Sequence, residues 1–107
     1  MTRDVTVYRS DTGREPFSEY VDALRDRVAV SRIRLRVTRA KLGNFGDHRT
    51  VGRGVIELRI DHGPGYRIYV GLHGDEVIVL LCAGSKSSQR SDIVKAWGYW
   101  EDFKRQI

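Results

Sequence analysis

Residues 56–61 and 66–70 alternate apolar and polar side chains, and a turn segment that reads DHGPG separates the two stretches. Period-two alternation on both sides of a short Gly/Pro segment is typical of an antiparallel β-hairpin. With Gly63 at the centre of the turn, the predicted register sets Ile60 opposite Tyr66.

The same register brings two arginines together. Arg59 lies opposite Arg67, and Glu57 lies opposite Tyr69 on the same face. Like charges placed directly opposite each other cost about 0.5 kcal/mol, so the pair favours an anionic partner, because a guanidinium fork matches phosphate geometry. The alternative is a surface network in which Glu57 or another acid neutralises both arginines.

The remaining pattern predicts two strands and three helices. Residues 77–83 are apolar on both faces, which is typical of a buried central strand, and residues 5–8 form a short first strand. Helical spacing of apolar residues marks 16–28, 30–40 and 93–103. Because no Pro or Gly separates the first two helical stretches, they form either a tight hairpin or one bent helix.

The predicted order is therefore β-α-α-β-β-β-α. This is an α+β fold with a small antiparallel sheet of about four strands and helices covering one side. At 107 residues the chain has room for one core, so residues 1–107 form a single domain.

Positive charge is concentrated in one segment. The formal net charge is +5, and residues 25–42 hold seven basic residues against one acidic residue. Arg32, Arg36 and Arg39 fall on one face of the second helix, with Lys41 following. An ordinary solvated face is the alternative, but arginines with so few acids between them favour contact with nucleic acid.

Further basic residues flank the hairpin. The loop from 44 to 53 carries Arg49 and Arg53, which we expect to border the same cleft. Lys86 follows the buried strand and lies beside Arg67 if the two strands are neighbours, where N–H groups of the next helix also favour an anion. The P-loop pattern is absent.

Several kinds of chemistry are not expected. The three histidines lie in predicted turns without ligand spacing, so we expect no metal site and no cofactor. Cys82 lies within the most apolar run and is interpreted as a reduced core residue. No apolar stretch is long enough to span a membrane and no apolar signal region begins the chain, which predicts a cytoplasmic protein without a membrane partner.

With metal, cofactor and thiol chemistry not expected, the groups that remain for catalysis are mainly basic side chains. RNA can be cleaved without a metal because its own 2′-hydroxyl is the nucleophile, so a protein needs only to orient the strand, stabilise the pentavalent phosphate and move protons. The candidate catalytic residues are Arg59, Arg67, Lys86, Glu57 and Asp92.

The order of elements, ELR followed by GPGYRIY, the apolar strand and the final GSKSSQRSDIVKAW resemble the RelE/HigB-like toxins of type II toxin-antitoxin systems. The resemblance is closest to the phage-related or addiction-module killer branch. It implies a compact RelE-like fold and a toxin that cuts mRNA in the A site of the 70S ribosome. It also implies a cognate antitoxin with a helix-turn-helix (HigA-like), through which alone the toxin contacts DNA.

The resemblance also carries residue roles. Arg67 falls where the family has its phosphate-stabilising arginine, Lys86 falls near the second basic position, and Arg59 lies on the strand that bears further functional groups. Asp92 stands in the region where the family often has a tyrosine, which leaves Glu57 and Asp92 as alternative bases. The predicted RNA and ribosome contacts are Arg32, Arg36, Arg39, Lys41, Arg49, Arg53 and Tyr66.

Two alternatives stay open. ParE-like toxins share the order of elements and poison DNA gyrase, and a degenerate toxin would only bind its antitoxin. The RNase hypothesis requires Arg59, Arg67 and Lys86 to converge on one open concave face, whereas the alternatives allow them to be dispersed or internally paired.

Overall fold

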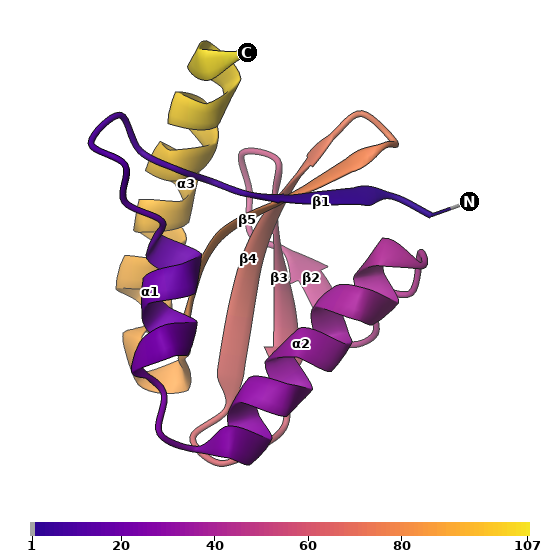
Figure 1. Cartoon of the computed structure of the whole chain (residues 1–107), viewed down its shortest axis with the longest axis vertical. Helices are drawn as coiled ribbons and strands as arrows, with labels where there is room; N and C mark the ends of the chain where they lie inside the picture. Colours follow the sequence, from indigo (N-terminus) through magenta and orange to yellow (C-terminus); the bar gives the residue numbers. More distant parts are fainter. Residues whose placement is uncertain (1) are drawn as a thin grey trace.

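Five strands form one sheet in the order β1-β5-β4-β3-β2 in the computed structural model, which describes residues 2–107 (Figure 1). Along the chain the elements are β1 (Asp4–Val7), α1 (Pro16–Ala23), α2 (Arg27–Lys41), β2 (His48–Thr50), β3 (Val55–Ile60), β4 (Tyr66–His73), β5 (Val77–Ser85), the short 3₁₀ turn η1 (Lys86–Ser88) and α3 (Gln89–Gln106).

The α+β class is confirmed, but the predicted sheet of four antiparallel strands is wrong in two respects. The expected loop 44–53 contains a fifth strand, β2, and β1 pairs with β5 in parallel, so the sheet is mixed. Strand β2 has three exposed residues and therefore no alternation that a sequence could display. Strand β1 is free to run parallel to β5 because a long helical connection, rather than a tight turn, separates it from the other strands.

The hairpin register is confirmed in full. Strand β3 pairs with β4 so that Arg59 lies opposite Arg67, Glu57 opposite Tyr69 and Ile60 opposite Tyr66. The turn between them contains Gly63 and Gly65, both with positive φ, which explains why glycine serves there.

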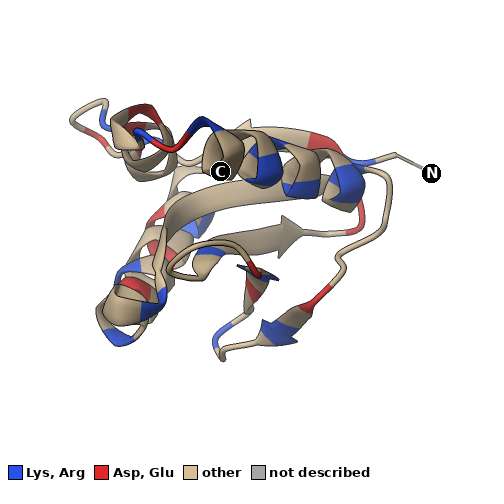
Figure 2. Ribbon diagram, turned by 90° about the horizontal axis from the view of Figure 1, so that it is seen from below, with Lys and Arg blue, Asp and Glu red and all other residues tan. Residues whose placement is uncertain are grey.

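Helices cover both faces of the sheet, so the expectation of helices on one side is wrong (Figure 2). Helices α1 and α2 pack on one face around Ile33, Leu58 and Ile68, whereas α3 packs on the other around Tyr69 and Trp100. Strand β5 is apolar on both faces, and burying both of them requires a helical layer on each side.

The first two helices are separate. Asp26, which lies between them, is the N-cap of α2. Its side chain accepts hydrogen bonds from the backbone N–H of Val28 at 2.9 Å and of Ala29 at 3.1 Å. Val28 therefore lies in the first turn of α2, which begins at Arg27, and does not belong to the first helix; its side chain is exposed.

Helix α3 lies directly against the sheet at a glycine. Trp100 of α3 is buried, and a Cβ atom placed on Gly71 of β4 would come within 2.6 Å of Trp100 Cδ2. The indole ring therefore fits against β4 only because residue 71 is glycine. Gly98 of the same helix faces open space.

We expect Gly71→Ala to lower the free energy of unfolding by roughly 2 kcal/mol, because the indole has no room to retreat within the packed layer. Gly98→Ala is the matched control and should leave stability unchanged or raise it by up to about 1 kcal/mol. Urea unfolding followed by circular dichroism measures both. Equal midpoints for Gly71→Ala and the unchanged protein would contradict this account of the packing.

Candidate functional site

The turn end of the β3–β4 hairpin and the turn after β5 enclose a hollow of about 420 Å³. Arg59 comes from β3, Arg67 from β4 and Lys86 from η1, so three cations from three elements meet there. Asp47, Ile60, Asp61 and Gly65 complete the lining. The three residues that the sequence predicts as the basic centre thus share one concave surface.

Arg67 is the most enclosed of these cations. Its side chain is 12% exposed, its Nη1 donates to the carbonyl oxygen of Gly65 at 2.9 Å, and its Nε lies 3.9 Å from Oε2 of Glu57. That Nε has no hydrogen-bond partner within residues 2–107. The guanidinium is thus held at the edge of the hollow, between the carbonyl oxygen of Gly65 and the carboxylate of Glu57.

Arg59 is more open and partly neutralised. Its Nη2 donates to Oδ1 of Asp47 at 2.9 Å, in an ion pair that is exposed on the aspartate side. Exposed ion pairs contribute little to stability and exchange partners easily. Arg59 can therefore turn from Asp47 to a bound phosphate.

Glu57 lies beneath the hollow and does not line it. Its carboxylate is fully buried and accepts hydrogen bonds from Arg49 Nε at 3.0 Å, Tyr69 Oη at 3.0 Å and Gln89 Nε2 at 2.9 Å. Four elements, β2, β3, β4 and α3, are joined through this one side chain. The sequence offered Glu57 as a base, but its position makes it a positioning residue for Arg67.

The electrostatics of this network keep Glu57 charged. Burial opposes ionisation, but hydrogen bonds from Gln89, Arg49 and Tyr69 outweigh burial and hold the pKa of Glu57 below its ordinary value. Burial and the charge of Glu57 raise the pKa of Tyr69, which therefore stays protonated and donates. A charged carboxylate next to Arg67 stabilises the arginine in its place.

Arg36 reaches the same region from the opposite side. Its guanidinium donates to the carbonyl oxygens of Arg59, of Phe45 at 2.6 Å and of Asp47 at 3.1 Å. Two of these three carbonyls belong to residues that line the hollow. Arg36, predicted as an RNA contact, is thus occupied in holding the backbone of the hollow.

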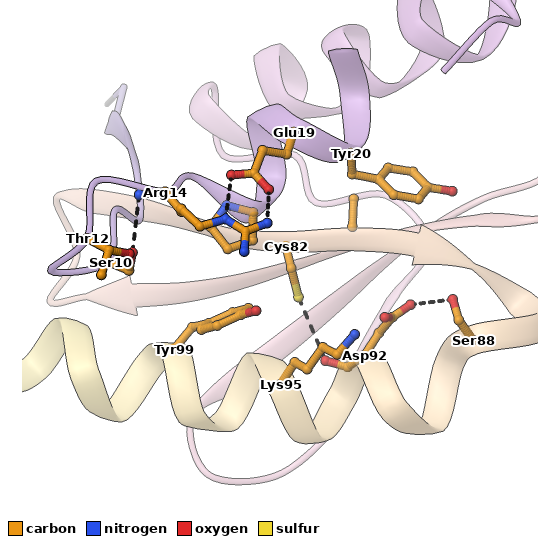
Figure 3. A pocket seen from close by; sticks show the side chains of 12 residues that line it. Ser10, Thr12, Arg14, Glu19, Tyr20, Cys82, Ser88, Asp92, Lys95 and Tyr99 are labelled. Atoms are coloured by element: carbon orange, nitrogen blue, oxygen red, sulfur yellow. Dashed lines mark hydrogen bonds and ion pairs between the residues drawn. The ribbon is translucent and has the colours of Figure 1, made fainter. Parts of the chain in front are cut away.

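Asp92, the other predicted base, lies elsewhere. It is buried, accepts a hydrogen bond from Ser88 Oγ at 2.6 Å and lines a separate hollow of about 660 Å³ between α1, β5 and α3 (Figure 3). Tyr20 and Tyr99 also line this hollow. Its residues come from positions far apart in the sequence, which is why no local pattern indicated it.

The other predicted contacts are divided between surface and core. Tyr66 is buried at 6% exposure against α1 and α2, so its ring adds to the core instead of offering a free stacking face. Arg53 covers the ring of Trp97 at 4.3 Å, and Arg49 is bound to Glu57. Three of the predicted contacts on α2 are exposed, Arg32, Arg39 and Lys41.

Cys82 is buried, as predicted, and burial together with the charge of Asp92 raises the pKa of its thiol to about 12. Nowhere in residues 2–107 do three His, Cys, Asp or Glu side chains gather as metal ligands would. Within the same range no helix has the length and apolar character needed to cross a membrane.

Comparison with known proteins places the chain beside one relative. No family model matches the chain. A protein of Haemophilus influenzae, named only as uncharacterized, is 41% identical over 80 residues, which is 75% of this chain and 81% of that protein. The two proteins belong to the same family. Because the name of the Haemophilus relative states no activity, the role of the family has to be argued from the site.

We expect Glu57→Gln to lower the free energy of unfolding by roughly 2 kcal/mol at neutral pH, since Arg49 and Arg67 lose a charged partner. The folded pKa of Glu57 lies below its ordinary value of 4.5, so this stabilisation is present above 4.5 and is lost as the pH falls through the folded pKa. The difference between variant and unchanged protein should therefore shrink in acid.

Urea unfolding at a series of pH values measures this difference, with the exposed Glu76→Gln as control. A difference that is constant with pH would show that Glu57 is not ionised in the folded protein.

Arg36→Met keeps the aliphatic stem but removes all three hydrogen bonds. We expect a loss of about 2 kcal/mol in the free energy of unfolding, because three carbonyl oxygens lose a charged donor. Arg32→Met, on the exposed side of the same helix, should change stability by less than about 0.5 kcal/mol. Equal effects of the two substitutions would refute the role assigned to Arg36.

Proposed function

We propose that the protein is the toxin of a type II toxin-antitoxin system and acts as a ribosome-dependent mRNA endoribonuclease that needs no metal. The observation that carries the proposal is the convergence of Arg59, Arg67 and Lys86 on one open hollow. Dispersed or fully paired cations would have favoured the alternatives. The resemblance of the hairpin and of the segment from Gly84 to Ala96 to RelE/HigB-like toxins supports the same function.

In the proposed reaction the 2′-hydroxyl of the substrate attacks the adjacent phosphorus. A bond forms from O2′ to phosphorus, the bond from phosphorus to O5′ breaks, and a 2′,3′-cyclic phosphate remains. Arg67 and Arg59 stabilise the additional negative charge of the pentavalent phosphate.

Proton transfer needs a group that faces the hollow. Glu57 and Asp92 are buried and do not line it, so Asp61, which does, takes their place as candidate base for the 2′-hydroxyl proton. Leaving-group protonation is assigned to Lys86, whose ammonium lies on the exposed rim.

The partners follow from the same resemblance. The mRNA is presented in the A site of the 70S ribosome. A cognate helix-turn-helix antitoxin holds the toxin inactive in the cytoplasm and supplies the only contact with DNA.

One observation favours a second candidate, a toxin homologue that only binds its antitoxin. Arg59 is paired with Asp47, and Arg67 lies near Glu57, so two of the three cations have an acid beside them within the chain. An inactive homologue would tolerate such pairing permanently.

Inducible expression in a bacterial host tests the proposal, with growth recorded and the 5′ ends of cellular mRNA mapped. We expect growth arrest with cuts in translated frames, and at least ~100-fold less cleavage for Arg67→Ala because a transition-state donor is lost. Arg14→Ala, which removes an exposed arginine paired with Glu19, should cleave normally.

Thermal unfolding of the purified variants separates lost chemistry from lost structure, and Lys86→Ala offers a second variant at an exposed position. Arrest with intact mRNA and broken chromosomes would replace the proposal with gyrase poisoning. No arrest at all would leave the binding-only homologue.

A further inference from the structure

The solvent side of α2 carries a line of exposed apolar residues. Val28 is 52% exposed, Leu35 47% and Leu42, directly after the helix, 63%. They follow one another at intervals of seven residues, which is close to two helical turns, so they lie along one stripe. We call Val28, Leu35 and Leu42 the outer seam.

The outer seam is not the face that packs on the sheet. Ala29, Ile33 and Ala40 are buried on the opposite side of α2 and belong to the core. Helix α2 is therefore apolar on two sides although only one of them is covered within the domain. A helix of this kind is typical of an interface.

Positive charge borders the seam along its length. From residue 27 to residue 46 the sequence contains no Asp or Glu, and its exposed cations on α2 are Arg27, Arg32, Arg34, Arg39 and Lys41. Arg32 and Arg39 come four residues after Val28 and Leu35, which places them beside the seam. A shallow hollow of about 280 Å³ lies between Arg27, Val28, Ser31, Arg32 and Leu35.

We propose that the outer seam binds an acidic amphipathic helix of a partner protein, with the partner's apolar residues against Val28, Leu35 and Leu42 and its carboxylates against the bordering arginines. Apolar residues that recur every seven residues form one row of a helix-on-helix contact, and unlike charges at its margins select the partner.

Other ligands would contact either the arginines or the apolar side chains of this surface favourably, but not both. RNA would pair with the arginines but would leave the aliphatic side chains without apolar contacts. A second copy of the chain would bring another α2 with the same positive charge, so the two helices would repel. Only a helix that is both apolar and acidic meets both requirements. The inference does not depend on RNA cleavage and stands if the proposed nuclease activity fails.

A synthetic helix of three heptads, with Leu at positions a and d and Glu at e and g, is a suitable probe because its own charge keeps it from pairing with itself. A control peptide carries Ser in place of each Leu. Fluorescence anisotropy with the full chain measures the dissociation constants. We expect the Leu peptide to bind at least ~10-fold more tightly, from burial of apolar surface.

Two substitutions then locate the site. Leu35→Glu should weaken binding of the Leu peptide by ~10-fold or more, and the uncharged Val28→Gln should weaken it by several-fold through apolar loss alone. Val94→Glu is the matched control, since Val94 is 60% exposed on α3, and it should bind as the unchanged protein does. Circular dichroism confirms that each variant is folded.

Equal binding of the Leu and Ser peptides would overturn the proposal, because charge alone would then explain the attraction. Displacement of the bound peptide by a short RNA duplex at lower concentration would assign the face to RNA. Binding to anionic vesicles that Leu35→Glu abolishes, without binding to the peptide, would assign it to a lipid surface. Self-association in sedimentation that Leu35→Glu abolishes would assign it to a second copy.

Discussion

The buried carboxylate of Glu57 is the constraint on which the candidate site depends. A charge without contact with water is tolerated only when donors surround it, and Arg49, Tyr69 and Gln89 provide them. Because these donors come from β2, β4 and α3, the carboxylate sets the positions of three elements relative to β3. The guanidinium of Arg67 sits against this fixed charge, which holds it at the edge of the hollow.

The sequence was sufficient for the hairpin and for the basic centre that depends on it. Alternation and a glycine turn predicted the pairing of Arg59 with Arg67, because a two-strand register is determined locally. The burial of Glu57 was beyond such reasoning. An alternating strand shows which residues share a face, but only the packing of α3 decides that this face is covered, and Gln89 lies 32 residues away along the chain.

Helix α2 illustrates the same limit. Helical periodicity placed Arg36 near Arg32 and Arg39, yet the long side chain of Arg36 turns toward carbonyl oxygens that no sequence pattern identifies as free. The short strand β2 was missed because all three of its residues are exposed and show no alternation. The N-cap at Asp26 was missed although Asp is a preferred N-cap residue, because neither Pro nor Gly separates the two helical stretches.

Arg36 connects helix α2 to the backbone that lines the hollow. One side of this helix of 15 residues faces solvent along the outer seam, and from its inner side a single guanidinium holds the backbone of Arg59 and Asp47. Any ligand that displaced α2 from the outside would therefore also move the backbone that lines the hollow. If such a ligand changed the affinity of the hollow for an anion, the anion would change the affinity of the seam by the same factor.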